Sequence, residues 1–225
     1  MNVFEKIGRW LTPYKYTFDE VVEIETKEKN RKKRKVVKNR RPILAEKEQK
    51  ELSDLLERGE IGIDVILINQ EMTKEAALDR LMKSGTHNAY FIHTEKHHQL
   101  AVKFEKGSAW RYYERSNNRR AKLKPLVQYR EKGKSDKTHL IPIGFHGSEN
   151  DERLLVDFDS KINRYDLKKF EEYIANVNAT EEVLWFVDIV KQDDETAIWK
   201  ACVWDNQGHI IKEQEFHDKN KFIWR

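Results

Sequence analysis

The chain has 225 residues, of which 38% are hydrophobic and 36% are charged, and its formal net charge is +4. Its single cysteine, Cys202, excludes an internal disulfide framework and a cysteine-based zinc cluster, and it favours a reducing compartment. The N-terminus has no signal-peptide core, and no apolar run approaches the ~20 residues of a spanning helix. We therefore expect a soluble, cytoplasmic protein without a membrane partner.

The cations are concentrated in two runs. Residues 27–41 carry ten Lys and Arg residues against one acid, and a second basic run covers residues 111–137. Concentrated cations suit a polyphosphate partner, because each neutralised phosphate releases counterions. Taken alone, either run fits a solvated protein surface equally well. The cations expected to contact a nucleic acid are Lys32, Lys33, Arg34, Lys35, Arg40, Arg41, Arg119 and Arg120.

The first part of the chain is predicted to be an N-terminal basic module of strands and helices, residues 1–87. Residues 1–44 are expected to form a basic arm or β-ribbon, and residues 45–87 a helix, a strand and a second helix. The leucines of residues 46–58 recur at helical spacing, residues 61–68 are apolar, and Thr73 is a typical N-cap for a helix ending at Met82.

Residues 88–225 are predicted to form a second domain. Residues 89–93 and 100–104 fit a hairpin, and residues 183–190, 197–204 and 209–216 fit an antiparallel β-meander. Between them, residues 164–177 carry apolar side chains at helical spacing. His93, His97 and His98 fall at the hairpin turn without a carboxylate at ligand spacing, so we interpret them as a solvated turn.

The most informative motif starts at residues 136–142 (DKTHLIP), which place His139 on an extended segment. Residues 145–148 (FHGS), the pair Asn163-Arg164 and Glu171 follow. A histidine can take a proton from water, an asparagine oxygen can bind a divalent cation, and a glutamate can hold the water shell of that ion. This layout resembles the DNA/RNA non-specific endonucleases of the ββα-metal (His-Me finger) superfamily.

The resemblance implies an α+β fold with a ββα-metal nuclease core and the β-meander. It implies a nuclease that hydrolyses DNA, RNA or both with low sequence specificity, using Mg²⁺, with Mn²⁺ as a possible substitute. His139 would be the general base and Asn163 the direct metal ligand. Glu171 would act on the ion through water, Arg164 would clamp a phosphate, and Lys137 would offer positive charge to phosphate.

Each of these residues also has an ordinary structural interpretation. His139 could be a half-buried strand histidine, Asn163 a helix N-cap, and Arg164 a partner for acids on the helix surface. Glu172 competes with Glu171 for its role.

The chain departs from the Asp-Arg-Gly-His form of the motif, since Lys137 and Thr138 replace the arginine and the glycine. Lysine cannot make a bidentate fork, and threonine lacks the backbone freedom of glycine. A non-cleaving nucleic-acid-binding protein of the same fold is therefore an alternative. Another is an effector or toxin nuclease controlled by an inhibitory or targeting protein. The residues do not distinguish DNA from RNA.

Overall fold

The computed structural model describes residues 50, 63–86, 88–111, 121–131, 133, 135–142, 145 and 151–225. The predicted arm, nearly all of the predicted helix over residues 46–58, Arg119, Arg120 and residues 146–148 lie outside this part of the chain. No helix in the described part is long and apolar enough to cross a membrane.

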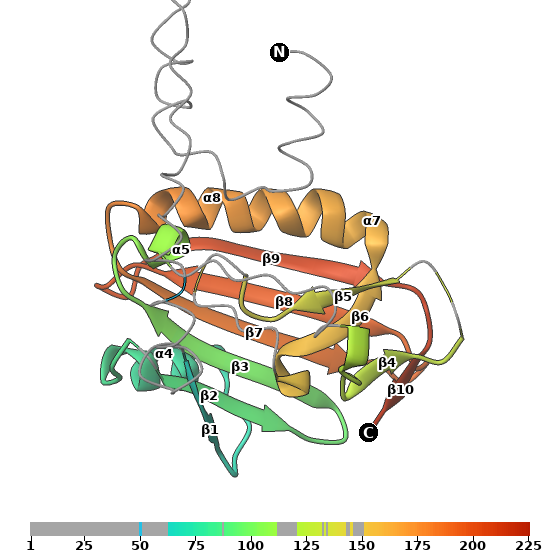
Figure 1. The fold of residues 1–225 in the computed structure, drawn as a ribbon. Helices are drawn as coiled ribbons and strands as arrows, with labels where there is room; N and C mark the ends of the chain where they lie inside the picture. The colour runs from blue at the N-terminus through green and yellow to red at the C-terminus, as the bar shows by residue number, and fades with distance from the viewer. Residues whose placement is uncertain are drawn as a thin grey trace, which may run out of the picture. The chain divides into compact units, whose positions relative to one another are not determined.

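A six-stranded sheet is the larger of two sheets (Figure 1). Its strand order is β1-β2-β3-β7-β8-β9, with β1 parallel to β2 and all other neighbours antiparallel. The strands are β1 (Asp64–Leu67), β2 (Asn88–His93), β3 (His97–Phe104), β7 (Val183–Lys191), β8 (Ala197–Trp204) and β9 (Ile210–Asp218). The hairpin and the meander thus lie where the sequence pattern predicts them.

Strand β7 is apolar on both faces because both faces are covered. Trp185 points to the face that is covered by the helix over residues 160–178, where its ring packs edge-on against Phe170 at a centroid distance of 5.6 Å. Phe186, the next residue, points to the opposite face and joins a cluster with Leu81 of helix α4 (Lys74–Met82). Alternating side chains of one strand therefore supply two separate cores.

Helix α4 begins at its predicted cap, because Thr73 Oγ1 accepts a hydrogen bond from Ala76 N. Ahead of the cap, the buried Gln99 side chain pairs with the backbone of Met72. Its Oε1 accepts from Met72 N at 2.8 Å and its Nε2 donates to Met72 O at 3.0 Å. This amide therefore fixes the start of α4 on strand β3.

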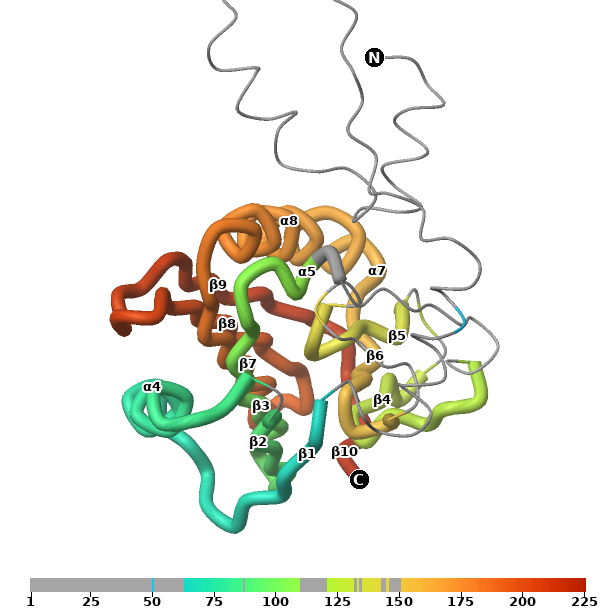
Figure 2. The backbone as a smooth tube through the Cα atoms, turned by 60° about the vertical axis from the view of Figure 1, so that its left-hand side comes forward, coloured from blue at the N-terminus to red at the C-terminus, as the bar shows by residue number. Residues whose placement is uncertain are grey.

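The smaller sheet has four strands in the order β10-β4-β6-β5, and it lies beside the larger one (Figure 2). The C-terminal strand β10 pairs with β4, and β6 pairs antiparallel with β5. Phe158 and Phe222 contact each other, and Phe158 also contacts Trp199 of the larger sheet. The strands are β4 (Val127–Tyr129), β5 (Ser135–His139), β6 (Leu155–Asp159) and β10 (Phe222–Trp224).

One continuous helix follows β6. It comprises α7 (Ser160–Ile162), the π-helical turn η3 (Asn163–Leu167) and α8 (Lys168–Asn178). Leu167, Phe170 and Ile174 are fully buried, which confirms most of the predicted apolar stripe. The short helices α5 (Ser108–Arg111) and η2 (Glu152–Leu154) complete the elements of the described residues.

The prediction of a ββα-metal core is wrong. Most of the regular structure is strand, arranged in two sheets. Strands β5 and β6 are joined to β4 and β10, and the helix docks on the other sheet through Phe170. The motif determines the order strand, strand, helix, but it does not determine the surfaces on which these elements pack.

The larger sheet continues across the predicted domain boundary at residue 87, because β1 pairs with β2. The division into residues 1–87 and 88–225 stays a prediction, since most of residues 1–62 lie outside the described part.

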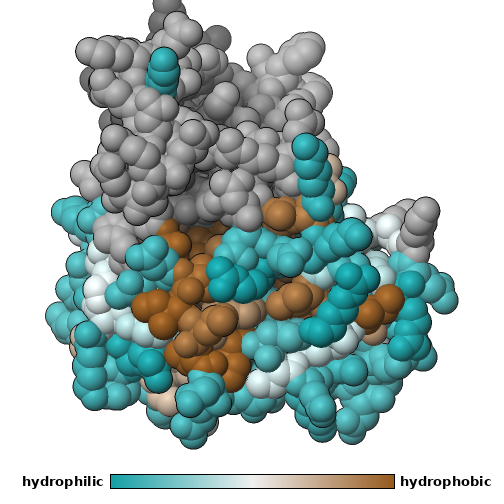
Figure 3. Space-filling view, turned by 60° about the horizontal axis from the view of Figure 1, so that its bottom comes forward, coloured by the Kyte–Doolittle hydropathy of each residue, from teal (hydrophilic) through white to brown (hydrophobic). Residues whose placement is uncertain are grey.

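On β1, Ile66 is 38% exposed and Leu67 is 67% exposed. Seen from below, the molecule also shows a patch of apolar surface (Figure 3).

Candidate functional site

Asp136 on strand β5 joins the two halves of the sequence motif. Its carboxylate accepts two hydrogen bonds from Arg164, from Nε to Oδ2 and from a terminal nitrogen to Oδ1, each 2.6 Å long. Asn163 Nδ2 donates to the same Oδ2 at 3.2 Å. The structure therefore brings Asn163 and Arg164 to Asp136 from 27 and 28 residues away.

The electrostatics of the cluster favour an ionised Asp136. Burial alone would raise the pKa of this carboxyl, but the hydrogen bonds from Arg164 and Asn163 outweigh burial and hold its pKa below the ordinary value. The bidentate fork is the strong form of the arginine–carboxylate contact. The Arg164 side chain as a whole remains 46% exposed.

Asn163 lies inside the helix and is not its N-cap. The cap is Asp159, whose side chain accepts from Lys161 N and Ile162 N. The bond from Nδ2 to Asp136 orients the amide of Asn163, so that its Oδ1 points away from the carboxylate. Asn163 also opens the π-helical turn, a rare feature that is frequently found at functional sites.

His139 is the last residue of β5 and is 9% exposed. Side chains alternate along a strand, so His139 and Asp136 leave β5 on opposite faces. Strand β5 is the last strand in the order of its sheet. The structure places His139 at the end of the strand that carries the cluster, but on its other face.

Lys137 shares the face of His139. Its Nζ donates to the backbone oxygens of Ala121 and Leu123, at 3.0 and 2.6 Å. These bonds tie the ammonium to the segment before β4. The predicted contact of Lys137 with phosphate stays a prediction.

Glu171 lies on α8, eight residues after Asn163, and is half-buried. Eight residues of helix span about 12 Å, so the helix does not bring Glu171 to the Asp136 cluster. Glu172, its competitor, lies 3.9 Å from Lys168 Nζ. The predicted water-mediated role of Glu171 therefore stays a prediction.

The residues fit a cation that needs few protein ligands. Among the described residues, no group of three or more His, Cys, Asp or Glu side chains is placed to hold a metal. Mg²⁺ commonly keeps several waters and takes one or two protein ligands beside substrate phosphates. The oriented Oδ1 of Asn163 suits that role, while both oxygens of Asp136 are already engaged by Arg164.

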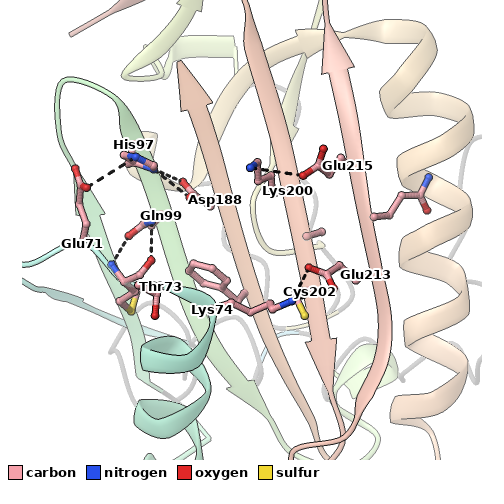
Figure 4. Close-up of a pocket in the computed structure, with 14 residues that line it drawn as sticks. Glu71, Thr73, Lys74, His97, Gln99, Asp188, Lys200, Cys202, Glu213 and Glu215 are labelled. Atoms are coloured by element: carbon pink, nitrogen blue, oxygen red, sulfur yellow. Dashed lines mark hydrogen bonds and ion pairs between the residues drawn. The ribbon is translucent and has the colours of Figure 1, made fainter. Parts of the chain in front are cut away.

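A groove of about 570 Å³, lined mainly by polar and charged side chains, lies on the face of the larger sheet that carries helix α4 (Figure 4). Its charges are paired internally. His97 Nδ1 lies 3.0 Å from both oxygens of Asp188, and Lys74 bonds Glu213. Burial raises the pKa of the Cys202 thiol in this groove to about 12, so it is no nucleophile at neutral pH. We assign no chemistry to this groove.

The interpretation of His93, His97 and His98 as a solvated turn is wrong. His98 is fully buried, His97 pairs with Asp188, and His93 bonds His98. The hairpin turn is present, but the three histidines lie on the flanking strands β2 and β3, where they contact segments that are distant in the sequence.

Sequence reasoning named Asp136 only as part of the motif and missed it as the centre of the cluster. The sequence did contain a signal for the importance of Asp136, because an aspartate three residues before the histidine is what the chain shares with the Asp-Arg-Gly-His form of the motif. Comparisons of the chain with protein-family models, curated proteins and solved structures gave no match.

Proposed function

We propose that the chain is a metal-dependent nuclease that hydrolyses phosphodiester bonds of DNA, RNA or both with low sequence specificity. The observation that carries this proposal is the contact of Asp136 with Asn163 and Arg164. It assembles an oriented amide oxygen and a partly exposed arginine side chain beside the strand that ends in His139. A neutral oxygen, a phosphate-binding cation and a general base are the groups that phosphodiester hydrolysis requires.

Each group has a defined task in this proposal. His139 takes the proton of the attacking water, and Arg164 binds a non-bridging phosphate oxygen. Asn163, with Glu171 through water, would hold the divalent cation, which supplies charge stabilisation to the phosphate and the leaving oxygen. Contacts to phosphate carry no sequence information, so low specificity follows.

The test is cleavage of plasmid DNA and of single-stranded RNA with Mg²⁺, Mn²⁺ or EDTA. We expect cleavage with the metals and none with EDTA. His139→Ala should lower the rate by ~10²–10⁴-fold, the range of a positioned general base, with metal affinity unchanged. Asn163→Ala should weaken metal binding, so that more metal partly restores its activity. Intact substrates under all metal conditions would refute the nuclease proposal.

A second candidate function is nucleic-acid binding without cleavage. The low exposure of His139, its position on the face of β5 opposite Asp136, and the engaged ammonium of Lys137 favour it. Binding of nucleic acid in EDTA together with no cleavage in any metal would select this function. The effector or toxin nuclease controlled by an inhibitory or targeting partner, the remaining alternative, stays a prediction.

A further inference from the structure

The helix that carries Asn163 and Arg164 also presents a stripe of alternating cations and aromatic rings. Lys161, Tyr165, Lys169 and Tyr173 follow one another at intervals of four residues, and all are exposed. Tyr165 is 56% exposed and Tyr173 is 47% exposed, and they are the large exposed aromatic side chains of the described residues. Both lie on this one helix.

The geometry of the helix keeps the stripe on one side. Four residues advance about 6 Å along a helix and, in a regular α-helix, drift sideways by about 40°. The π-helical turn at Asn163–Leu167 is wound more loosely, so it offsets part of that drift between Lys161 and Tyr165. The result is an exposed track that begins beside the Asp136 cluster and continues along α8.

The cations that belong to the track itself could follow a polyanion. Residues 161–173, over which the track runs, contain four cations and the three acids Asp166, Glu171 and Glu172, none of which is a member of the track. Among the described contacts, Lys161 and Lys169 take part in no ion pair. From strand β9, Lys212 Nζ lies 4.8 Å from the ring centre of Tyr173, which adds a cation at the far end of the track.

Space for a ligand adjoins the start of the track. A hollow of about 650 Å³ is lined by side chains of both charges and by one aromatic ring. The helix and the residue before it contribute Asp159, Lys161, Ile162, Tyr165 and Asp166, and the end of β9 and the turn after it contribute His217, Asp218, Lys219 and Asn220. A flat ring next to Tyr165 would have polar side chains within reach of its edge. The hollow therefore fits a nucleobase better than a phosphate alone.

We propose that this track, Lys161, Tyr165, Lys169 and Tyr173, binds single-stranded nucleic acid and leads it to Asn163 and Arg164. Aromatic rings that alternate with cations bind single strands by stacking on successive bases while the cations follow the phosphates. A duplex buries its base faces and offers no ring to stack. The inference rests on the proposed nuclease function, because it gives that site its substrate class.

The experiment measures binding of the full chain by fluorescence anisotropy in EDTA, so that cleavage does not interfere. The probes are an oligothymidylate and an oligouridylate of about twelve nucleotides, within the usual site sizes of such proteins, and a duplex of similar length. The variants are Tyr165→Ala, Tyr173→Ala, Tyr165→Phe and Lys169→Ala. Lys83→Ala, on the exposed surface of α4, is the control.

Each Tyr→Ala variant should weaken single-strand binding by about 5–150-fold, the equivalent of one stacked base. Tyr165→Phe keeps the ring and should bind within about threefold of the parent. Lys169→Ala should lower the slope of log affinity against log salt by ~0.7. The duplex should respond weakly, and Lys83→Ala should change nothing. The two single-stranded probes would show whether DNA or RNA is preferred.

The proposal is overturned if the folded parent does not bind single strands, if the Tyr→Ala variants bind like the parent, or if they lose duplex affinity equally. Circular dichroism of each variant confirms that it is folded. Failure of the nuclease proposal looks different. If the protein binds single strands through Tyr165 and Tyr173 but cleaves no substrate, the proposed binding track is supported and the proposed nuclease function is refuted.

Discussion

His93 and His98 share a hydrogen bond between their Nδ1 atoms, which lie 2.9 Å apart. The other nitrogens bind backbone oxygens, His98 Nε2 that of Arg153 and His93 Nε2 that of Arg225. Trp224 stacks on His93 at 5.4 Å and donates its Nε1 proton to Thr94 O. The pair therefore connects the hairpin β2–β3 of the larger sheet to β10 and to the turn before β6.

This pair makes stability depend on pH. Burial, followed by the neighbouring His93, lowers the pKa of His98 to about 3, and burial also lowers the pKa of His93. In the unfolded chain both titrate near ~6.5. Because the folded values are lower, the stabilisation is present above about pH 6.5 and is lost as the pH falls from there towards 3.

We expect the free energy of unfolding, measured by urea titration, to fall between about pH 7 and pH 4.5. Carboxyl groups contribute to any such fall, so the comparison with His93→Gln is decisive. Glutamine keeps a hydrogen-bonding group but does not titrate, and the variant should show a shallower pH dependence. Equal slopes in the parent and the variant would contradict the assignment.

Asp136→Asn tests the cluster of the candidate site. The change removes the ion pair with Arg164 and loosens the orientation of Asn163. The pair is partly exposed, so the loss of stability should be at most about 1 kcal/mol. The loss of metal affinity or cleavage should be larger, ~10–100-fold, as for groups that orient a metal ligand. Calorimetric metal titration beside thermal unfolding separates the two effects, and a loss of stability alone would reduce Asp136 to a structural residue.

Gln99→Leu tests the attachment of helix α4. Leucine has a similar size but leaves the backbone N–H and C=O of Met72 without their buried partner. Each unsatisfied group costs about 1–3 kcal/mol, so the variant should lose about 2–6 kcal/mol in urea unfolding. Gln207→Leu, in an exposed turn, should change stability by less than about 0.5 kcal/mol.

Phe222→Ala tests the smaller sheet. Phe222 is 1% exposed and packs against Tyr129 and Phe158. Truncating a buried phenylalanine costs about 3–5 kcal/mol. Hydrogen exchange should show the loss mainly in β4, β5, β6 and β10, while β7 and β8 keep their protection. A uniform loss over both sheets would show that the two sheets unfold as a single unit.

The sequence predicts local elements well and their mutual packing poorly. The alternation of apolar residues locates β7, β8 and β9, and Thr73 locates the start of α4, because both signals depend on neighbours in the chain. The contact of Asp136 with Asn163 and Arg164 spans 27 and 28 residues, and that of Thr94 with Trp224 spans 130. No local sequence pattern predicts such contacts, because they depend on how the two sheets pack against each other.

The same reason explains the error in the fold class. Considered alone, the motif of a strand that carries a histidine and a helix that carries an asparagine suggests a self-contained ββα-metal core. The stripe of Leu167, Phe170 and Ile174 correctly predicts that the helix has a docking face, but any apolar surface would satisfy it. The surface that it covers here is that of the larger sheet, at Trp185 and Phe216.

The position of β10 has a consequence for the newly made chain. The ribosome delivers residues in order, so the six strands of the larger sheet, β1 to β3 and β7 to β9, are all made before residues 222–224. Strand β10 borders β4, so the smaller sheet gains this outer strand only after the larger sheet has all of its strands. A chain that stops after β9 would keep every strand of the larger sheet and would lack the outer strand of the smaller one. The order of synthesis thus allows the larger sheet to form before the smaller sheet is complete.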